Sequence, residues 1–105
     1  MYTAFEAFIS GPETAVVNIT TSEEFDKFLE VCEKRGLNKE KINFLRRIGF
    51  EGCQKHVIKG DLCIEYIIGK GFTFGNKMSY IDYCDYAEDS IISFDDFVNN
   101  VDMCF

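Results

Sequence analysis

The sequence predicts a single α+β domain that combines a small antiparallel sheet with two central helices and two short C-terminal helices. Three observations predict this class. Segments 21–35 and 38–48 place apolar residues at helical spacing behind a capping residue. Short β-branched runs bounded by glycine, such as 62–68, are typical of strands that pair as hairpins. The 105 residues, 47% of them hydrophobic, suffice for one core and include no linker, so residues 1–105 form one domain.

The N-terminal residues predict a hairpin of two strands. Residues 2–9 alternate along the chain, with Phe5, Ala7 and Ile9 on one side, which favours a strand. Residues 10–13, Ser-Gly-Pro-Glu, are a turn signal. The β-branched run at 15–19 is the second strand and pairs back on the first.

The two central helices are predicted from their ends. The Thr21 hydroxyl can accept from the Glu24 amide while the Glu24 carboxylate reaches back to the Thr21 amide, which is a capping box. Gly36 ends this helix as a left-handed cap. Asn38 caps the next helix, which Gly49 ends. Their buried stripes are Phe25, Phe28, Leu29 and Cys32 in the first helix and Ile42, Leu45 and Ile48 in the second.

Three further strands form a short meander. Residues 54–58 and 62–68 surround the turn Lys59-Gly60-Asp61, and 72–74 follow Gly69-Lys70-Gly71.

The C-terminal part ends in a helix, a strand and a helix. Ser79 caps the first of these helices, Ile91-Ile92 is the strand, and Ser93 caps the last helix. The inner faces carry Tyr80, Tyr83, Cys84 and Ala87 in the first and Phe94, Phe97 and Val101 in the second.

Charge is sorted along the chain into blocks. Residues 1–33 have a net charge of −6, residues 34–59 of +6, residues 60–77 of zero and residues 78–105 of −7, so the overall −7 conceals a dipolar chain. Carboxylates on a rigid surface can imitate the phosphates of DNA and occupy a basic groove of a partner. The same acids can also serve only as dipole partners at helix starts and as solubilising residues. The candidate partner-binding residues are the acids Asp82, Asp85, Glu88, Asp89, Asp95 and Asp96 with the aromatic residues Tyr80, Tyr83 and Tyr86.

The basic segment allows two interpretations. It could bind phosphates, but the surrounding acidic blocks repel a polyanion and no nucleic-acid-binding signature is present, so direct nucleic-acid binding is not expected. The preferred interpretation is intramolecular complementarity, in which the basic helix faces an acidic block. The segment comprises Lys34, Arg35, Lys39, Lys41, Arg46, Arg47, Lys55 and Lys59.

Neither catalysis nor a metal site is predicted. His56 is the single imidazole and lies in a predicted strand with no nucleophile motif beside it. The glycines at 69, 71 and 75 join strands and lack the Lys-Ser/Thr of a phosphate loop. The cysteines have no short paired spacing, so we interpret most of them as core residues, and no cofactor is expected: Cys32, Cys53, Cys63, Cys84 and Cys104.

The expected location is the cytoplasm, which is the host cytoplasm if a phage encodes the chain. The N-terminus shows no secretory signal, no apolar run reaches the ~20 residues of a membrane span, and the cysteine usage suits a reducing compartment. We expect no membrane association, and a monomer or a small homo-oligomer.

Several segments resemble small proteins of phages and mobile elements. These are TSEEFDKFLEVCEKRGL at 21–37, the strand meander, and YCDYAEDSIISFDDF at 83–97, which ends in a strand and helix of the I-S-F-x-D-F type. TAFEAFISG at 3–11 and FLRRIGFEG at 44–52 resemble fragments of DNA-mimic antirestriction proteins. The resemblance implies an anti-CRISPR or other anti-defence inhibitor.

The leading hypothesis is therefore a non-enzymatic inhibitor that binds a host nucleic-acid-targeting defence protein through an acidic, DNA-mimicking surface. Two alternatives stay open. One is a module that sequesters a small ligand such as a nucleotide, with a pocket around Tyr66, Phe72 and Phe74. The other is a structural or adaptor protein of a phage.

Overall fold

The computed structural model describes residues 2–10, 15–55, 57, 62–77 and 91–103, with Ser10 described by its backbone alone. Within these residues the α+β class is confirmed. The elements in chain order are β1 (Tyr2–Thr3), α1 (Ala4–Ser10), β2 (Val16–Ile19), α2 (Ser22–Lys34), α3 (Lys39–Gln54), β3 (Leu62–Ile67), β4 (Gly71–Asn76), β5 (Ile91–Ile92), α5 (Phe94–Asn99) and β6 (Asp102–Met103).

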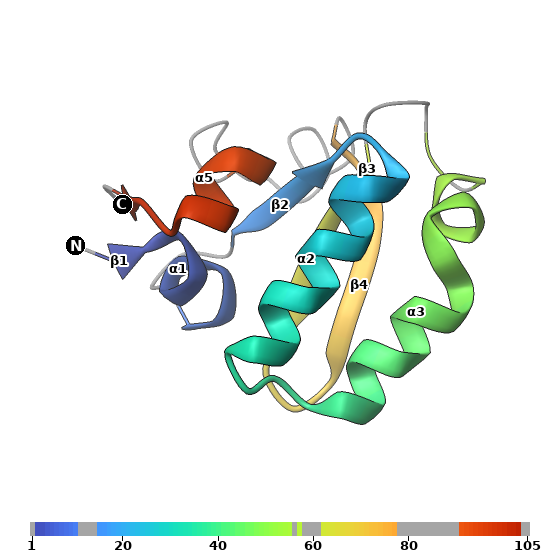
Figure 1. Cartoon of the computed structure of the whole chain (residues 1–105), viewed down its shortest axis with the longest axis horizontal. Helices are drawn as coiled ribbons and strands as arrows, with labels where there is room; N and C mark the ends of the chain where they lie inside the picture. Colours follow the sequence, from blue (N-terminus) through green and yellow to red (C-terminus); the bar gives the residue numbers. More distant parts are fainter. Residues whose placement is uncertain (1, 11–14, 56, 58–61, 78–90, 104–105) are drawn as a thin grey trace.

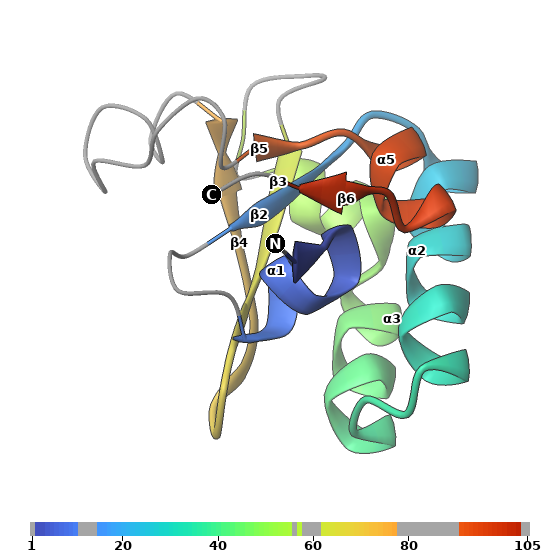
Figure 2. The same cartoon turned by 90° about the vertical axis from the view of Figure 1, so that its left-hand side faces the viewer.

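A four-stranded sheet in the order β4-β3-β2-β5 forms one layer, and α2 and α3 cover one of its faces (Figure 2). The β4-β3 and β3-β2 pairs are antiparallel, whereas β2 and β5 are parallel. The short β1 and β6 strands pair separately, and α1 and α5 lie beside them at the end of the molecule where the two termini meet (Figure 1). The sheet is thus mainly antiparallel, as predicted, with one parallel pair that sequence reasoning did not include.

The aromatic core lies where α1, α2 and α5 meet the sheet. The Phe8 ring is 5.6 Å from the ring of Phe28 and 5.4 Å from that of Phe97, and Phe28 and Phe97 are themselves 5.1 Å apart. Each fully buried phenylalanine contributes roughly 1.5–3 kcal/mol through the apolar surface that it removes from water. These contacts hold α5 against α1 and α2.

The predicted strand at 2–9 is wrong, because α1 occupies Ala4–Ser10. Thr3 and Glu6 form a capping box: the Thr3 hydroxyl accepts from the Glu6 amide at 3.3 Å, and Glu6 Oε1 accepts from the Thr3 amide at 3.1 Å. The next amides of the helix are satisfied by the C-terminal region, since Ala4 donates to the Val101 carbonyl at 2.7 Å. The period-2 pattern is therefore overridden by local capping and tertiary contacts.

The predicted N-terminal hairpin is wrong as well. β2 forms as expected, but it pairs with β3 on one side and with β5 on the other. The N-terminal segment that would have been its partner is helical in α1. Residues 11–13 of the predicted turn lie outside the described residues.

The predicted start and end of α2 are confirmed. Thr21 Oγ1 accepts from the Glu24 amide at 3.1 Å, although the Glu24 carboxylate bonds the amide and hydroxyl of Thr20 rather than the Thr21 amide. At the other end the Gly36 amide donates to the Glu33 carbonyl, Leu37 donates to the Cys32 carbonyl, and the φ of Gly36 is 84°. This is a Schellman ending, and it turns the chain directly into α3.

α3 starts as predicted and ends later. Asn38 Oδ1 accepts from the amides of Glu40 and Lys41 at 2.8 and 3.3 Å. Gly49 interrupts the helix with φ 73° and ψ 167°, but helical structure resumes and continues to Gln54. The predicted strand at 54–58 is therefore wrong at its start, because Gln54 belongs to the helix and Lys55 is its C-cap. Residues 56 and 58 lie outside the described part of the chain.

The remaining predicted elements agree with the structure where it describes them. β3 and β4 form the expected hairpin, β5 is the expected strand, and Ser93 Oγ caps α5 by accepting from the Asp96 amide at 3.2 Å. Val101 lies beyond the end of α5, because Asn100 takes a left-handed conformation and stops the helix. The helix predicted to begin at Ser79 falls at 78–90, outside the described residues.

Candidate functional site

The parallel pairing of β2 with β5 positions two helix starts side by side. Val16 is opposite Ile91 and Val17 is opposite Ile92, so the carboxyl ends of both strands reach the same edge of the sheet. Each strand then leads almost directly into a helix, α2 or α5, through a hydroxyl cap. Ligand sites in sheets with parallel strands commonly lie outside the carboxyl ends of the strands, which makes this edge a candidate.

Acidic residues from both acidic blocks of the sequence meet at this edge. Glu23 and Glu24 lie in the first turn of α2, and Asp95 and Asp96 lie in the first turn of α5. Glu23 and Asp95 are exposed, while Glu24 and Asp96 are half-buried. We call these four residues the acidic edge. A hollow of about 180 Å³ separates the two helix starts and is lined by Asn18, Thr20, Glu24, Ser93, Phe94 and Asp95.

The helix starts hold the acidic edge in place. Carboxylates in a first helical turn interact favourably with the helix dipole, by about 0.3–1 kcal/mol each at an exposed position. The Glu24 carboxylate also accepts from the Thr20 amide at 2.9 Å. None of the ion pairs found among the described residues involves the acidic edge. Its negative charge is therefore available to a partner.

Of the predicted partner-binding residues, the structure describes two. Asp95 and Asp96 lie on the acidic edge, as stated above. The other seven fall at residues 78–90, outside the described part of the chain: Tyr80, Asp82, Tyr83, Asp85, Tyr86, Glu88 and Asp89.

Sequence reasoning missed Glu23 and Glu24 as members of this surface, since it interpreted them only as residues of the helix start, with Glu24 in the capping box and both acids favourable to the helix dipole. A signal was present. The runs VVNITTSEE at 16–24 and IISFDD at 91–96 share one order: a short apolar strand, a hydroxyl residue and two adjacent acids. Two such units that pair in parallel must place their acids at the same edge.

The basic segment partly faces the acids of α2. Arg46 Nη2 lies 3.4 Å from Glu33 Oε2, and Lys34 Nζ lies 3.0 Å from Glu30 Oε1. The hydrogen bond from Lys34 and the nearby charge of Lys27 hold the pKa of the Glu30 carboxyl below its ordinary value. The Arg46–Glu33 pair joins α3 to α2, so it agrees with the predicted complementarity between the basic helix and an acidic block, here the first one; Lys34 and Glu30 both lie within α2.

Basic residues gather at the far end of α2 from the acidic edge. The helix has 13 residues, which corresponds to about 20 Å. Lys34 and Arg35 lie at its end, and Lys39 and Lys41 follow at the start of α3 (Figure 1). The charge blocks of the sequence thus become a spatial dipole along α2.

The aromatic residues of the suggested ligand pocket lie mostly in the core. The Tyr66 ring is 6.2 Å from that of Phe8 and 5.3 Å from that of Phe72. Phe74 also packs against the core, and Phe72 borders a surface hollow.

Buried thiols account for three of the cysteines. Cys32, Cys53 and Cys63 are buried thiols, as the core interpretation predicts. Burial raises the pKa of the Cys53 thiol to about 11 and raises that of Cys32 further. Thiols with raised pKa values are poor nucleophiles at neutral pH. Cys84, Cys104 and His56 lie outside the described residues.

Among residues 2–10, 15–55, 57, 62–77 and 91–103, no three His, Cys, Asp or Glu side chains are grouped as a metal site. Over the same ranges no helix combines the length and apolar character needed to cross a membrane.

Comparison of the chain with protein-family models, with curated proteins and with solved structures finds no match in any of the three.

Proposed function

We propose that this protein is a phage-type inhibitor that binds a host nucleic-acid-targeting defence protein and occupies its basic groove in place of DNA. The observation that carries the proposal is the parallel β2-β5 pair, because it brings acids from both ends of the sequence to one exposed edge. The proposed role is binding without catalysis, and carboxylates in the first turns of two helices support it because they can contact the cations of a partner.

The acidic edge has the physical properties that such a role requires. A basic groove that binds DNA releases counterions when its cations meet phosphates, and carboxylates held on two helix starts can meet the same cations. Their positions are set by capped helices and buried strands, so little conformational entropy is lost on binding. The proposal also includes the other partner-binding residues predicted from the sequence, which lie outside the described residues: the acids Asp82, Asp85, Glu88 and Asp89, and Tyr80, Tyr83 and Tyr86 as aromatic anchors.

A plaque assay tests the function directly. Bacteria that carry a restriction or CRISPR system should become permissive to a targeted phage when they express the protein. The double variant Glu23→Lys and Asp95→Lys should lose this effect, because it reverses one exposed carboxylate in each helix start.

The matched control is the double variant Glu40→Lys and Asp102→Lys. It changes the net charge by the same amount, and both acids are exposed and lie away from the acidic edge. It should protect the phage as well as the unmodified protein does. Equal protection by the acidic-edge variant and the control, both folded by circular dichroism, would contradict the proposal.

Competition separates groove binding from other inhibition. Duplex DNA should displace the inhibitor from the purified defence protein, and the association rate should fall as salt screens the charges over the Debye length of about 10 Å at 0.1 M. A complex that binds DNA and inhibitor together, with no change in affinity for either, would exclude the mimicry mechanism.

A further inference from the structure

A second surface lies at the opposite end of α2 from the acidic edge. Here the first half of α3 faces the turn between β3 and β4, and a hollow of about 400 Å³ opens between them. We call it the basic hollow. It is lined by Glu40, Lys41, Phe44, Arg47, Lys70 and Phe72.

Three cations surround this hollow, and none of them belongs to an ion pair found among the described residues. The ion pairs among the described residues engage Lys27, Lys34 and Arg46, and none involves Lys41, Arg47 or Lys70. Glu40 is the single acid in the lining. The hollow therefore carries a net positive charge in a protein whose overall charge is −7.

Gly71 allows one of these cations to lie over the β3-β4 turn. A Cβ atom at Gly71 would come within 2.8 Å of Lys41 Cδ, so the absence of a side chain permits the Lys41 stem to rest on the strand. Gly71 has a φ of 112°, which also favours glycine. The contact brings the Lys41 chain to the turn that carries Lys70.

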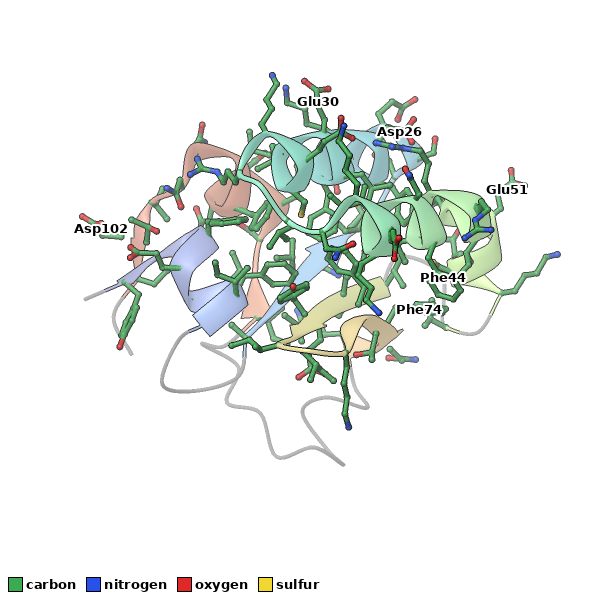
Figure 3. All side chains as sticks on the ribbon, turned by 90° about the horizontal axis from the view of Figure 1, so that it is seen from below. Asp26, Glu30, Phe44, Glu51, Phe74 and Asp102 are labelled. Carbon is green, nitrogen blue, oxygen red and sulfur yellow. The ribbon has the colours of Figure 1, made fainter. Side chains whose placement is uncertain are left out.

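An aromatic ring is presented between the cations. Phe44 is 54% exposed, one of two large hydrophobic side chains that the described residues leave in solvent. Figure 3 shows its side chain extending from α3 toward the β4 side, whereas Asp26 and Glu30 extend from α2 in the other direction. Lys41, Phe44 and Arg47 follow one another at intervals of three residues, so they share one face of α3. Phe72 adds a second, half-buried ring at the base.

We propose that the basic hollow binds a mononucleotide, whose phosphate contacts Lys41, Arg47 or Lys70 and whose base stacks on Phe44. A volume near 400 Å³ lies within the usual range for small-ligand sites. A base gains binding energy by stacking on the exposed Phe44 ring, which a bare phosphate cannot do. A nucleic-acid strand fits less well, because the acidic remainder of the chain repels a polyanion over a longer range.

Titration calorimetry with AMP, adenosine and inorganic phosphate tests the ligand class. AMP should bind more tightly than either fragment, since only AMP engages both the cations and the ring. Phosphate binding as tight as that of AMP would remove the role of Phe44 and overturn the proposal. An absence of AMP binding, or tighter binding of a single-stranded oligonucleotide, would also overturn it.

Variants locate the site. The double variant Arg47→Gln and Lys70→Gln should weaken AMP binding by at least about tenfold through the lost charge-assisted hydrogen bonds. Phe44→Ala should weaken the binding of AMP without affecting the binding of inorganic phosphate. The matched control is Lys39→Gln and Lys55→Gln, two exposed cations of the α3 segment that do not line the hollow. Equal affinity in the hollow variant and the control contradicts the assignment.

This binding site is independent of the proposed inhibitor function. The acidic-edge residues changed in the plaque assay, Glu23 and Asp95, lie in the first turns of α2 and α5, whereas Phe44, Arg47 and Lys70 line the basic hollow at the other end of α2. Failure of one experiment therefore leaves the other informative.

Discussion

The side chain of Asn100 accepts a hydrogen bond from the Phe5 amide, with 2.9 Å between Oδ1 and N, and so joins the end of α5 to the start of α1. Asn100 has φ 51° and ψ 48°, a left-handed conformation that asparagine tolerates better than most residues. One residue thus stops a helix at one end of the sequence and caps a helix at the other. This junction holds α5, and with it half of the acidic edge, against the core.

Removing the acceptor at Asn100 should destabilise the protein. We expect Asn100→Ala to lower the free energy of unfolding by about 1–3 kcal/mol, because it leaves the Phe5 amide without its partner and places alanine in a left-handed conformation. Asn100→Gly should lower the unfolding free energy less, because glycine adopts the left-handed conformation without strain. Asn100→Asp should retain nearly full stability, because its carboxylate still accepts the hydrogen bond from the Phe5 amide. Urea denaturation measures all three. An Asn100→Asp variant as unstable as Asn100→Ala would show that the bond is unimportant.

The Thr3-Glu6 capping box should make stability depend on pH. Hydrogen bonds from the Thr3 amide and then the Thr3 hydroxyl hold the pKa of the Glu6 carboxyl below its ordinary value of 4.5. The ionised carboxylate therefore stabilises the folded state above that value, and this contribution is lost as pH falls through the lower pKa of the folded protein. The difference in unfolding free energy between the unmodified protein and Glu6→Gln should shrink on acidification below pH 4.5.

A second variant assigns this effect. In a Thr3→Ala background the hydroxyl contact is missing, so the pH dependence of the Glu6→Gln difference should be smaller. A difference that stays constant from pH 7 to about pH 3 would show that the box does not perturb Glu6.

Two glycines with positive φ should respond differently to asparagine. Gly36 occupies the left-handed position of a Schellman ending, where asparagine is accepted. Gly49 combines φ 73° with ψ 167°, a region that is essentially restricted to glycine. Neither position has an atom within 4 Å of an added Cβ, so space does not decide the outcome.

We therefore expect Gly49→Asn to cost about 1–3 kcal/mol of unfolding free energy and Gly36→Asn to cost clearly less. Thermal or urea unfolding of the two variants provides the measurement. Equal losses would mean that the break in α3 relaxes to another conformation when Gly49 is replaced.

The thiols of Cys32 and Cys53 should resist alkylation in the folded protein. Both are buried, and burial raises the pKa of Cys53 to about 11, so little thiolate is present near pH 8. Iodoacetamide should modify neither residue in the native state and both in urea, as followed by peptide mass spectrometry. Rapid native labelling of Cys53 would reveal local opening of the end of α3.

Elements whose signals are local can be predicted from the sequence alone. Helix starts are capped by the side chains of Thr21, Asn38 and Ser93, and α2 ends at Gly36. Each of these residues acts as predicted, through a hydrogen bond to a residue two or three positions away. The β3-β4 hairpin likewise depends on a short turn between neighbouring strands. Such interactions are encoded in a few adjacent residues, so a single sequence suffices to predict them.

Tertiary structure decided which distant segments meet. Residues 2–9 have an alternating pattern, yet Asn100 and Val101 satisfy the first amides of α1, so the segment is helical from Ala4. The same is true of both surfaces. Glu24 and Asp95 line one hollow only because β2 and β5 pair in parallel, and Lys70 joins Lys41 and Arg47 only because the β3-β4 turn packs beside α3. These contacts are stabilised by the burial of a shared apolar core. No local pattern in one sequence specifies which strands become neighbours in the sheet.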